Sequence, residues 1–86
     1  MLREDAILLS KMLKVEQKEN RGIYPEDLVS RQILSKHNCK AKVDSFVENN
    51  LLTFESTHGA NVYHVTKHGI YQICAYRDLA LEIKEA

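Results

Sequence analysis

The chain has 86 residues, which predicts one small domain. Hydrophobic residues make up 44% and charged residues 28%, and this composition excludes a chain that is disordered over its whole length. The 12 basic and 12 acidic side chains cancel, which weakens any simple claim of nucleic-acid binding, and the positions of the charges must decide.

Cysteine spacing and hydropathy favour a reducing compartment inside a cell. Cys39 and Cys74 do not form a CxxC pair. No apolar run approaches the roughly 20 residues that a membrane helix needs. Glu4 and Asp5 stand where a secretion signal would be basic. We therefore expect a cytoplasmic protein with no membrane association.

An amphipathic helix is predicted over residues 3–19. Leu9 and Met12 belong to an apolar stripe with helical spacing. Acidic residues near the start and Lys18 near the end suit the helix dipole. Gly22 is expected to follow the helix in a left-handed conformation.

A short extended stretch at residues 23–24 and a second helix are predicted next. Tyr24 precedes Pro25, and a following proline favours β geometry. Pro25 itself suits the first turn of a helix, where its missing N–H costs nothing. Apolar residues as far as Leu34 predict that this helix runs to about Ser35.

A third helix is predicted after a turn at residues 36–38. Asn38 is a good N-cap residue for it. Val43 and Phe46 share its inward face, and Leu51 follows where the chain leaves the helix.

A β-hairpin and a last helix complete the predicted order. Residues 53–57 and 62–66 are rich in β-branched and aromatic side chains and flank a turn at residues 58–61. Thr66 is expected to cap a final helix over residues 67–84.

Two runs of residues carry a resemblance to a known family. Where the third helix leads into the hairpin the chain reads Val43-x-x-Phe46-Val47-x-x-x-Leu51-Leu52. Where the hairpin leads into the last helix it reads Tyr63-x-Val65-Thr66-x-x-Gly69-x-x-x-Ile73. Both runs resemble the winged helix-turn-helix family, as in PadR-type and MarR-type regulators and small archaeal winged-helix proteins with a C-terminal dimerisation helix. The resemblance implies an α+β fold with three helices, a small β-hairpin wing and a C-terminal helix, in one domain over residues 1–86.

Asn50 is one departure from the family, which often has glycine before the first wing strand. Asparagine tolerates left-handed backbone conformations better than most residues do. The departure is therefore compatible with the fold.

The resemblance implies a small transcriptional regulator that places its third helix in the major groove of double-stranded DNA. Between Leu28 and Val43 the chain carries four basic residues and no acidic one, which is a local basic patch. The residues expected to bind DNA are Arg31, Lys36, His37, Lys40, Ala41, Lys42, Ser45, Asn49, His58 and Asn61.

A second interpretation is a winged-helix module that docks on a protein and does not bind DNA. Asp44 and Glu48 favour it, because carboxylates on the outward face of the third helix repel phosphate. The turn of the hairpin at residues 58–61 contains neither arginine nor lysine, so an inert turn is an alternative to a wing that contacts DNA.

The last helix carries more apolar surface than one buried face needs, which favours a homodimer. The alternative is a monomer whose wide apolar helix covers its own core. The residues expected in the dimer interface are Ile70, Ile73, Tyr76, Leu79 and Ile83.

Catalytic, cofactor and metal sites are not predicted, and no small-molecule ligand is evident. His64 and His68 are four residues apart, but a boundary between strand and helix separates them, so histidines at the surface are expected. Cys39 is either a reactive thiol at a helix N-terminus or a buried, inert residue. A bridge between Cys39 and Cys74 is left open by the sequence.

Overall fold

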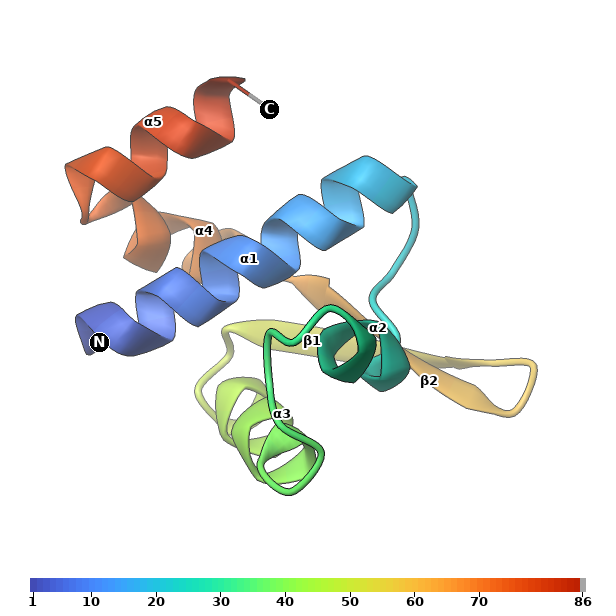
Figure 1. Ribbon diagram of the computed structural model, residues 1–86. Coiled ribbons are helices and arrows are strands. Elements are labelled where there is room, and N and C mark those ends of the chain that lie inside the picture. Colours follow the sequence, from blue (N-terminus) through green and yellow to red (C-terminus); the bar gives the residue numbers. More distant parts are fainter. Residues whose placement is uncertain (86) are drawn as a thin grey trace.

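A computed structural model describes residues 1–85 and confirms the predicted α+β class. Helix α1 crosses the middle of the molecule (Figure 1). One side of α1 carries α2, α3 and the hairpin, and the other carries α4 and α5. The elements in chain order are α1 (Arg3–Glu19), α2 (Pro25–Ser30), α3 (Cys39–Glu48), β1 (Leu52–Thr57), β2 (Ala60–Val65), α4 (Lys67–Cys74) and α5 (Arg77–Glu85).

The hydrophobic core lies against α1, whose predicted bounds are confirmed. Leu9 and Met12 of α1 are fully buried, because their spacing places them on one face of the helix. Leu28 of α2, Phe46 of α3 and Ile73 of α4 complete the centre of this core. Leu79 of α5 also belongs to it, so one small core joins all five helices.

Gly22 is required for space, and the predicted left-handed conformation there is wrong. Asn20 takes that conformation instead, with φ of 52°. A Cβ atom added at Gly22 would lie 1.9 Å from Cγ1 of Val62, so the hairpin packs directly on this backbone. Glycine is thus needed here for a close approach of two segments.

Helix α2 is shorter than predicted, because it ends at Ser30 and not near Ser35. Gln32 turns the chain with φ of 60°. Its N–H donates to the Val29 carbonyl (3.1 Å), and the N–H of Ile33 donates to the Leu28 carbonyl (2.9 Å). These two bonds form a Schellman motif, which closes the helix and directs the chain towards α3.

Helix α3 begins after Asn38 as predicted, although the Asn38 side chain makes no capping bond to the described backbone. The helix ends in a second Schellman motif. Asn50 has φ of 60°, and the N–H of Leu51 donates to the Phe46 carbonyl (2.8 Å). The expectation that asparagine can replace glycine at this position is confirmed.

The hairpin has a tighter turn and longer strands than predicted. Leu52 of β1 pairs with Val65 of β2, and the ladder continues to a turn of two residues, His58 and Gly59. Both turn residues have positive φ, as the common two-residue hairpin turn requires. The predicted extended stretch at residues 23–24 is confirmed in part, because Ile23 forms an antiparallel bridge to Tyr63 of β2.

The predicted single helix over residues 67–84 is wrong, since the chain changes direction at Ala75–Tyr76 and forms α4 and α5 (Figure 1). Thr66 caps α4 as predicted, because its Oγ1 accepts a hydrogen bond from the Gly69 N–H (3.0 Å). Helix α5 runs beside α1 in the same direction. Two ion pairs hold it there, Arg3–Asp78 near the start of both helices and Lys14–Glu82 further along.

Candidate nucleic-acid interface

The outward surface of α3 carries most of the residues predicted to bind DNA. Lys36 and His37 are exposed in the turn before the helix. Lys40, Ala41 and Ser45 are exposed on the helix itself, because the helical period turns Val43 and Phe46 inward. The structure therefore brings these five polar or small positions together on one surface.

Two of the four basic side chains in the predicted patch are neutralised by acids of α1. Arg31 forms an ion pair with Glu19. Lys42 lies 3.0 Å from Asp5, and its ammonium also lies 5.8 Å from the centre of the Phe46 ring. These contacts turn both side chains towards the rest of the domain and reduce the positive charge that they offer to a ligand.

Lys36 and Lys40 make up the uncompensated part of the patch. Neither has an ion-pair partner among the side chains of residues 1–83. Both are exposed, and both lie close to the N-terminal end of α3. Sequence spacing alone did not distinguish them from Arg31 and Lys42, because the acids that pair with the latter belong to a different helix.

Asn49, His58 and Asn61 lie outside this group of five residues, at the end of α3 and on the hairpin. Asn49 is exposed at the C-terminal end of α3, and its side-chain amide donates to the Ser45 carbonyl (2.8 Å). His58 is exposed in the turn of the hairpin. Asn61 is exposed near the start of β2 and accepts a hydrogen bond from the Ser56 hydroxyl (3.1 Å). The hairpin thus contributes two of the residues that were predicted to bind DNA, His58 and Asn61.

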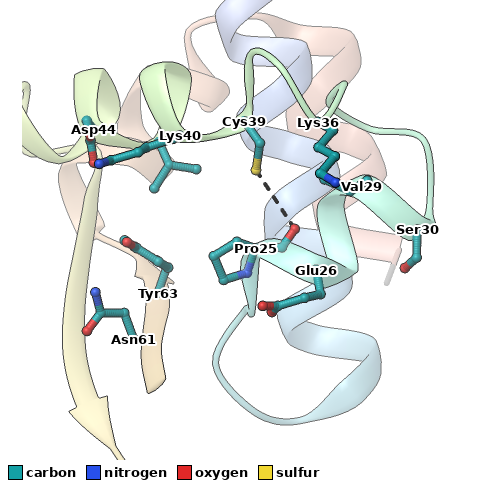
Figure 2. Close-up of a pocket in the computed structure, with 11 residues that line it drawn as sticks. Pro25, Glu26, Val29, Ser30, Lys36, Cys39, Lys40, Asp44, Asn61 and Tyr63 are labelled. Atoms are coloured by element: carbon teal, nitrogen blue, oxygen red, sulfur yellow. Dashed lines mark hydrogen bonds between the residues drawn. The ribbon is translucent and has the colours of Figure 1, made fainter. Parts of the chain in front are cut away.

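A groove separates α2 and α3 from one face of the hairpin (Figure 2). Its volume is about 710 Å³. Apolar side chains line most of it, including Val29 of α2, Val43 of α3 and Tyr63 of β2. The sequence did not predict this feature, because it depends on how the hairpin folds back beside the two helices.

Charged residues of both signs stand around the groove. Lys36 and Lys40 contribute positive charge, and Glu26 and Asp44 contribute negative charge. Lys40 and Asp44 are one helical turn apart on α3, and neither forms an ion pair with a described side chain. Glu26 belongs to α2 and Lys36 to the following turn, so the remaining two charges come from separate segments.

The opposite face of the hairpin is fastened to α1 through His64. Its Nδ1 lies 2.9 Å from Oε2 of Glu16, and its Nε2 lies 3.3 Å from Oε1 of Glu55. Hydrogen bonding to Glu16 is the main cause that raises the pKa of His64, with Glu55 adding to it and burial opposing it. The second oxygen of Glu16 accepts the N–H of Val65 (3.0 Å). The hairpin is therefore held on this side and open to the groove on the other.

Two of the five residues predicted for the dimer interface are unavailable at the surface. Ile73 is fully buried and Leu79 is 6% exposed, because both pack into the core of their own chain. Their prediction is therefore wrong. The other three, Ile70, Tyr76 and Ile83, are half-buried. The Tyr76 hydroxyl donates to the Met1 carbonyl (2.9 Å) and ties the start of α5 to the start of α1.

The exposed apolar residues of α4 and α5 are not those that were predicted for the dimer interface. Tyr71 of α4 is 73% exposed and Leu81 of α5 is 52% exposed. The break between α4 and α5 rotates the second half of the predicted helix, which explains why its faces were assigned wrongly from one continuous period.

The two cysteines are free, and Cys39 is inert by position. Its side chain is buried, and burial raises the pKa of the thiol, so the nucleophilic thiolate is disfavoured. Cys74 is exposed on α4. In the part of the chain that the structure describes, no three potential ligands gather around a metal position. Within the same residues no helix combines the length and apolar character needed to cross a membrane.

Comparison with known proteins identifies the fold. No protein-family model matches this chain, and no curated protein sequence matches it. The crystal structure of SSV1 F-93 is similar over 99% of this chain and 90% of that chain, with a TM-score of 0.59 and 16% sequence identity. The fold is a winged helix. In this fold α2 and α3 form the helix-turn-helix and the β1–β2 hairpin is the wing.

Proposed function

We propose that this winged-helix protein binds duplex DNA as a small regulator, with α3 in the major groove. The observation that carries the proposal is the pair of uncompensated lysines, Lys36 and Lys40, beside the outward face of the recognition helix. A helix in this position reaches base edges with its N-terminal half, while basic side chains around it bind phosphates.

The exposed residues divide into contacts that position the protein and contacts that read sequence. Lys36, His37 and Lys40 contact phosphates. Ala41 and Ser45 lie where α3 faces the bases, Ala41 for apolar contact with a thymine methyl group and Ser45 for a hydrogen bond to a base edge. Asn49, His58 and Asn61 provide polar contacts to the DNA backbone.

Arg31 and Lys42 have a secondary role in this proposal. Their ion pairs with Glu19 and Asp5 must open before either side chain can bind phosphate. The electrostatic contribution of each side chain to DNA binding is therefore smaller than that of Lys40.

We also propose a homodimer, which would place two recognition helices on one duplex. Ile70, Tyr76 and Ile83 remain in the proposed interface. Tyr71 and Leu81 join them, because their exposed apolar side chains lie on the same two helices.

The test of DNA binding is the salt dependence of affinity for a random-sequence duplex. The logarithm of the binding constant should fall linearly with the logarithm of salt concentration, by about 0.9 for each phosphate contacted. Lys40→Ala should flatten this slope by about one unit. Lys42→Ala is the matched control, because it removes an equal charge from the same helix but one that Asp5 already neutralises. Its slope should change less than that of Lys40→Ala.

Absence of binding by the wild-type protein at low salt would refute the proposal. It would leave the second candidate, a winged-helix module that docks on a protein. The exposed carboxylates of Asp44 and Glu48 on α3 favour that candidate, because a protein partner can pair with them and a phosphate backbone cannot.

A further inference from the structure

The groove between α2, α3 and the hairpin has the size and lining of a ligand site. Its volume of about 710 Å³ falls inside the range of roughly 300–1,000 Å³ that is usual for small-molecule pockets. Val29, Val43 and Tyr63 provide an apolar lining from three separate elements. The hairpin wall is fixed from behind by His64 and Glu16, so the groove does not depend on a loose strand.

The charges around the groove define the ligand that fits it. Lys40 and Asp44 lie one turn apart on the same helix, and no ion pair joins them among the described side chains. Lys36 and Glu26 are a second pair of opposite charges, and they lie on different segments of the wall. Neither belongs to an ion pair among the described side chains. A ligand with one charge would satisfy only one of them.

We propose that this groove binds a hydrophobic zwitterion of the α-amino acid type. Lys36 binds the carboxylate of the ligand, and Glu26 binds its ammonium group. The apolar side chain of the ligand lies against Val43 and Tyr63. Each partner carries a charge opposite to the group it meets, and the apolar surface between them excludes water from the ligand's hydrophobic part.

Occupation of the groove has a consequence for the recognition surface. Lys36 and Lys40 line the groove and are also the proposed phosphate contacts. A bound zwitterion would place a carboxylate beside Lys36, and would therefore compete with a DNA phosphate for the same ammonium group. The ligand would act as an effector that lowers affinity for DNA.

The experiment is an amide-shift titration of the ¹⁵N-labelled full chain with three probes. The probes share an indole ring and differ in the charged groups that they carry. L-tryptophan carries both charged groups, indole-3-propionate lacks the ammonium and tryptamine lacks the carboxylate. We expect saturable shifts at Val29, Val43 and Tyr63 with tryptophan. Each singly charged analogue should bind about three- to tenfold more weakly, because it loses one charge-assisted contact at a partly exposed site.

Two variants assign the charged contacts. Lys36→Met should weaken tryptophan and indole-3-propionate and leave tryptamine unchanged. Glu26→Gln should weaken tryptophan and tryptamine and leave indole-3-propionate unchanged. Both side chains are exposed, so the variants should melt like the wild type. Lys11→Met, which removes an exposed lysine of α1 outside the groove, is the matched control and should change nothing.

Three results would overturn the proposal. They are equal affinity for the three probes, shifts that saturate at residues outside the groove, and no saturable shift with any probe. The titration contains no DNA, so a failure of the proposed DNA binding does not affect its outcome. Competition is measured separately, by adding tryptophan to the complex with duplex DNA.

Discussion

His64 joins three elements through one imidazole ring. The ring belongs to β2, and its two nitrogens face Glu16 of α1 and Glu55 of β1. A protonated imidazole donates from both nitrogens, so this arrangement is complete only in the charged form. The raised pKa of His64 follows directly, with the hydrogen bond to Glu16 as its largest cause.

The stability that His64 contributes should therefore decline with rising pH. Because its pKa is raised in the folded state, the contribution is present in full below the unfolded pKa of about 6.5 and is lost as pH rises through the folded value. Urea unfolding from pH 5.5 to 9 should show that wild type has a larger unfolding free energy than His64→Gln, and this difference should shrink at high pH. The difference should stay below about 1 kcal/mol, because solvent screens a side chain that is one-third exposed.

His68→Gln provides the control for that experiment, since His68 is an exposed residue of α4 outside the cluster. Its difference from wild type should not follow the same trend. If the loss of unfolding free energy in His64→Gln grew with pH, the predicted direction of the pH dependence would be wrong.

Gly22 gives a second prediction at this scale. Gly22→Ala should cost about 1–3 kcal/mol of unfolding free energy, because the added methyl group would overlap Val62. The same substitution should cost less in a Val62→Ala background, where the overlapping side chain is shortened. Equal costs in the two backgrounds, measured by chemical denaturation, would show that the overlap is not the cause.

At the scale of elements, Asn50 decides how α3 ends. Its left-handed backbone allows the chain to leave α3 and enter β1 with only three residues between the two elements. Asn50→Gly should leave stability within about 0.5 kcal/mol of wild type, because glycine adopts this conformation freely. Asn50→Val should lose about 1–2 kcal/mol, because a β-branched side chain is strained there.

Glu48→Val is the matched comparison for Asn50→Val. It places the same side chain in the last turn of α3, where the backbone is helical and exposed. Its cost should be the smaller of the two. If Asn50→Val were as stable as Asn50→Gly in chemical denaturation, the stability of the domain would not depend on a left-handed backbone at residue 50.

The bounds of the elements could be predicted where a local signal exists. The stripe of α1 and the cap at Thr66 are such signals, and both predictions are confirmed. The end of α2 was missed because Gln32, which is neither glycine nor asparagine, adopts the left-handed conformation. The break at Ala75–Tyr76 was missed for a similar reason, because neither residue is a helix breaker and tertiary packing bends the chain.

At the scale of the whole molecule, the candidate site was predictable only in outline. The basic residues around α3 are local in sequence and could be found there. The pairing of Lys42 with Asp5 joins residues 37 apart, and no spacing rule predicts it. The groove was equally hidden, because its walls come from α2, α3 and β2. Burial of Leu79 by α1 likewise required the complete fold.

The proposed dimer is tested at the same scale. Sedimentation at micromolar concentration should give a dimer for the wild type and a monomer for Leu81→Glu, because burial of an unpaired carboxylate in an apolar interface is strongly unfavourable. Thr53→Glu adds the same charge at an exposed position of β1 and should remain dimeric. A monomer for the wild type at every concentration would refute the dimer, provided that Leu81→Glu melts like the wild type.

The position of α1 also governs how the chain folds. Its partners lie far along the sequence, since Glu16 meets His64 across 48 residues and Arg3 meets Asp78 across 75. During synthesis α1 therefore emerges long before these partners exist. Its apolar face stays unsatisfied until the hairpin and α5 arrive, so the domain should fold late and as one cooperative unit, more slowly than a helical bundle of similar length.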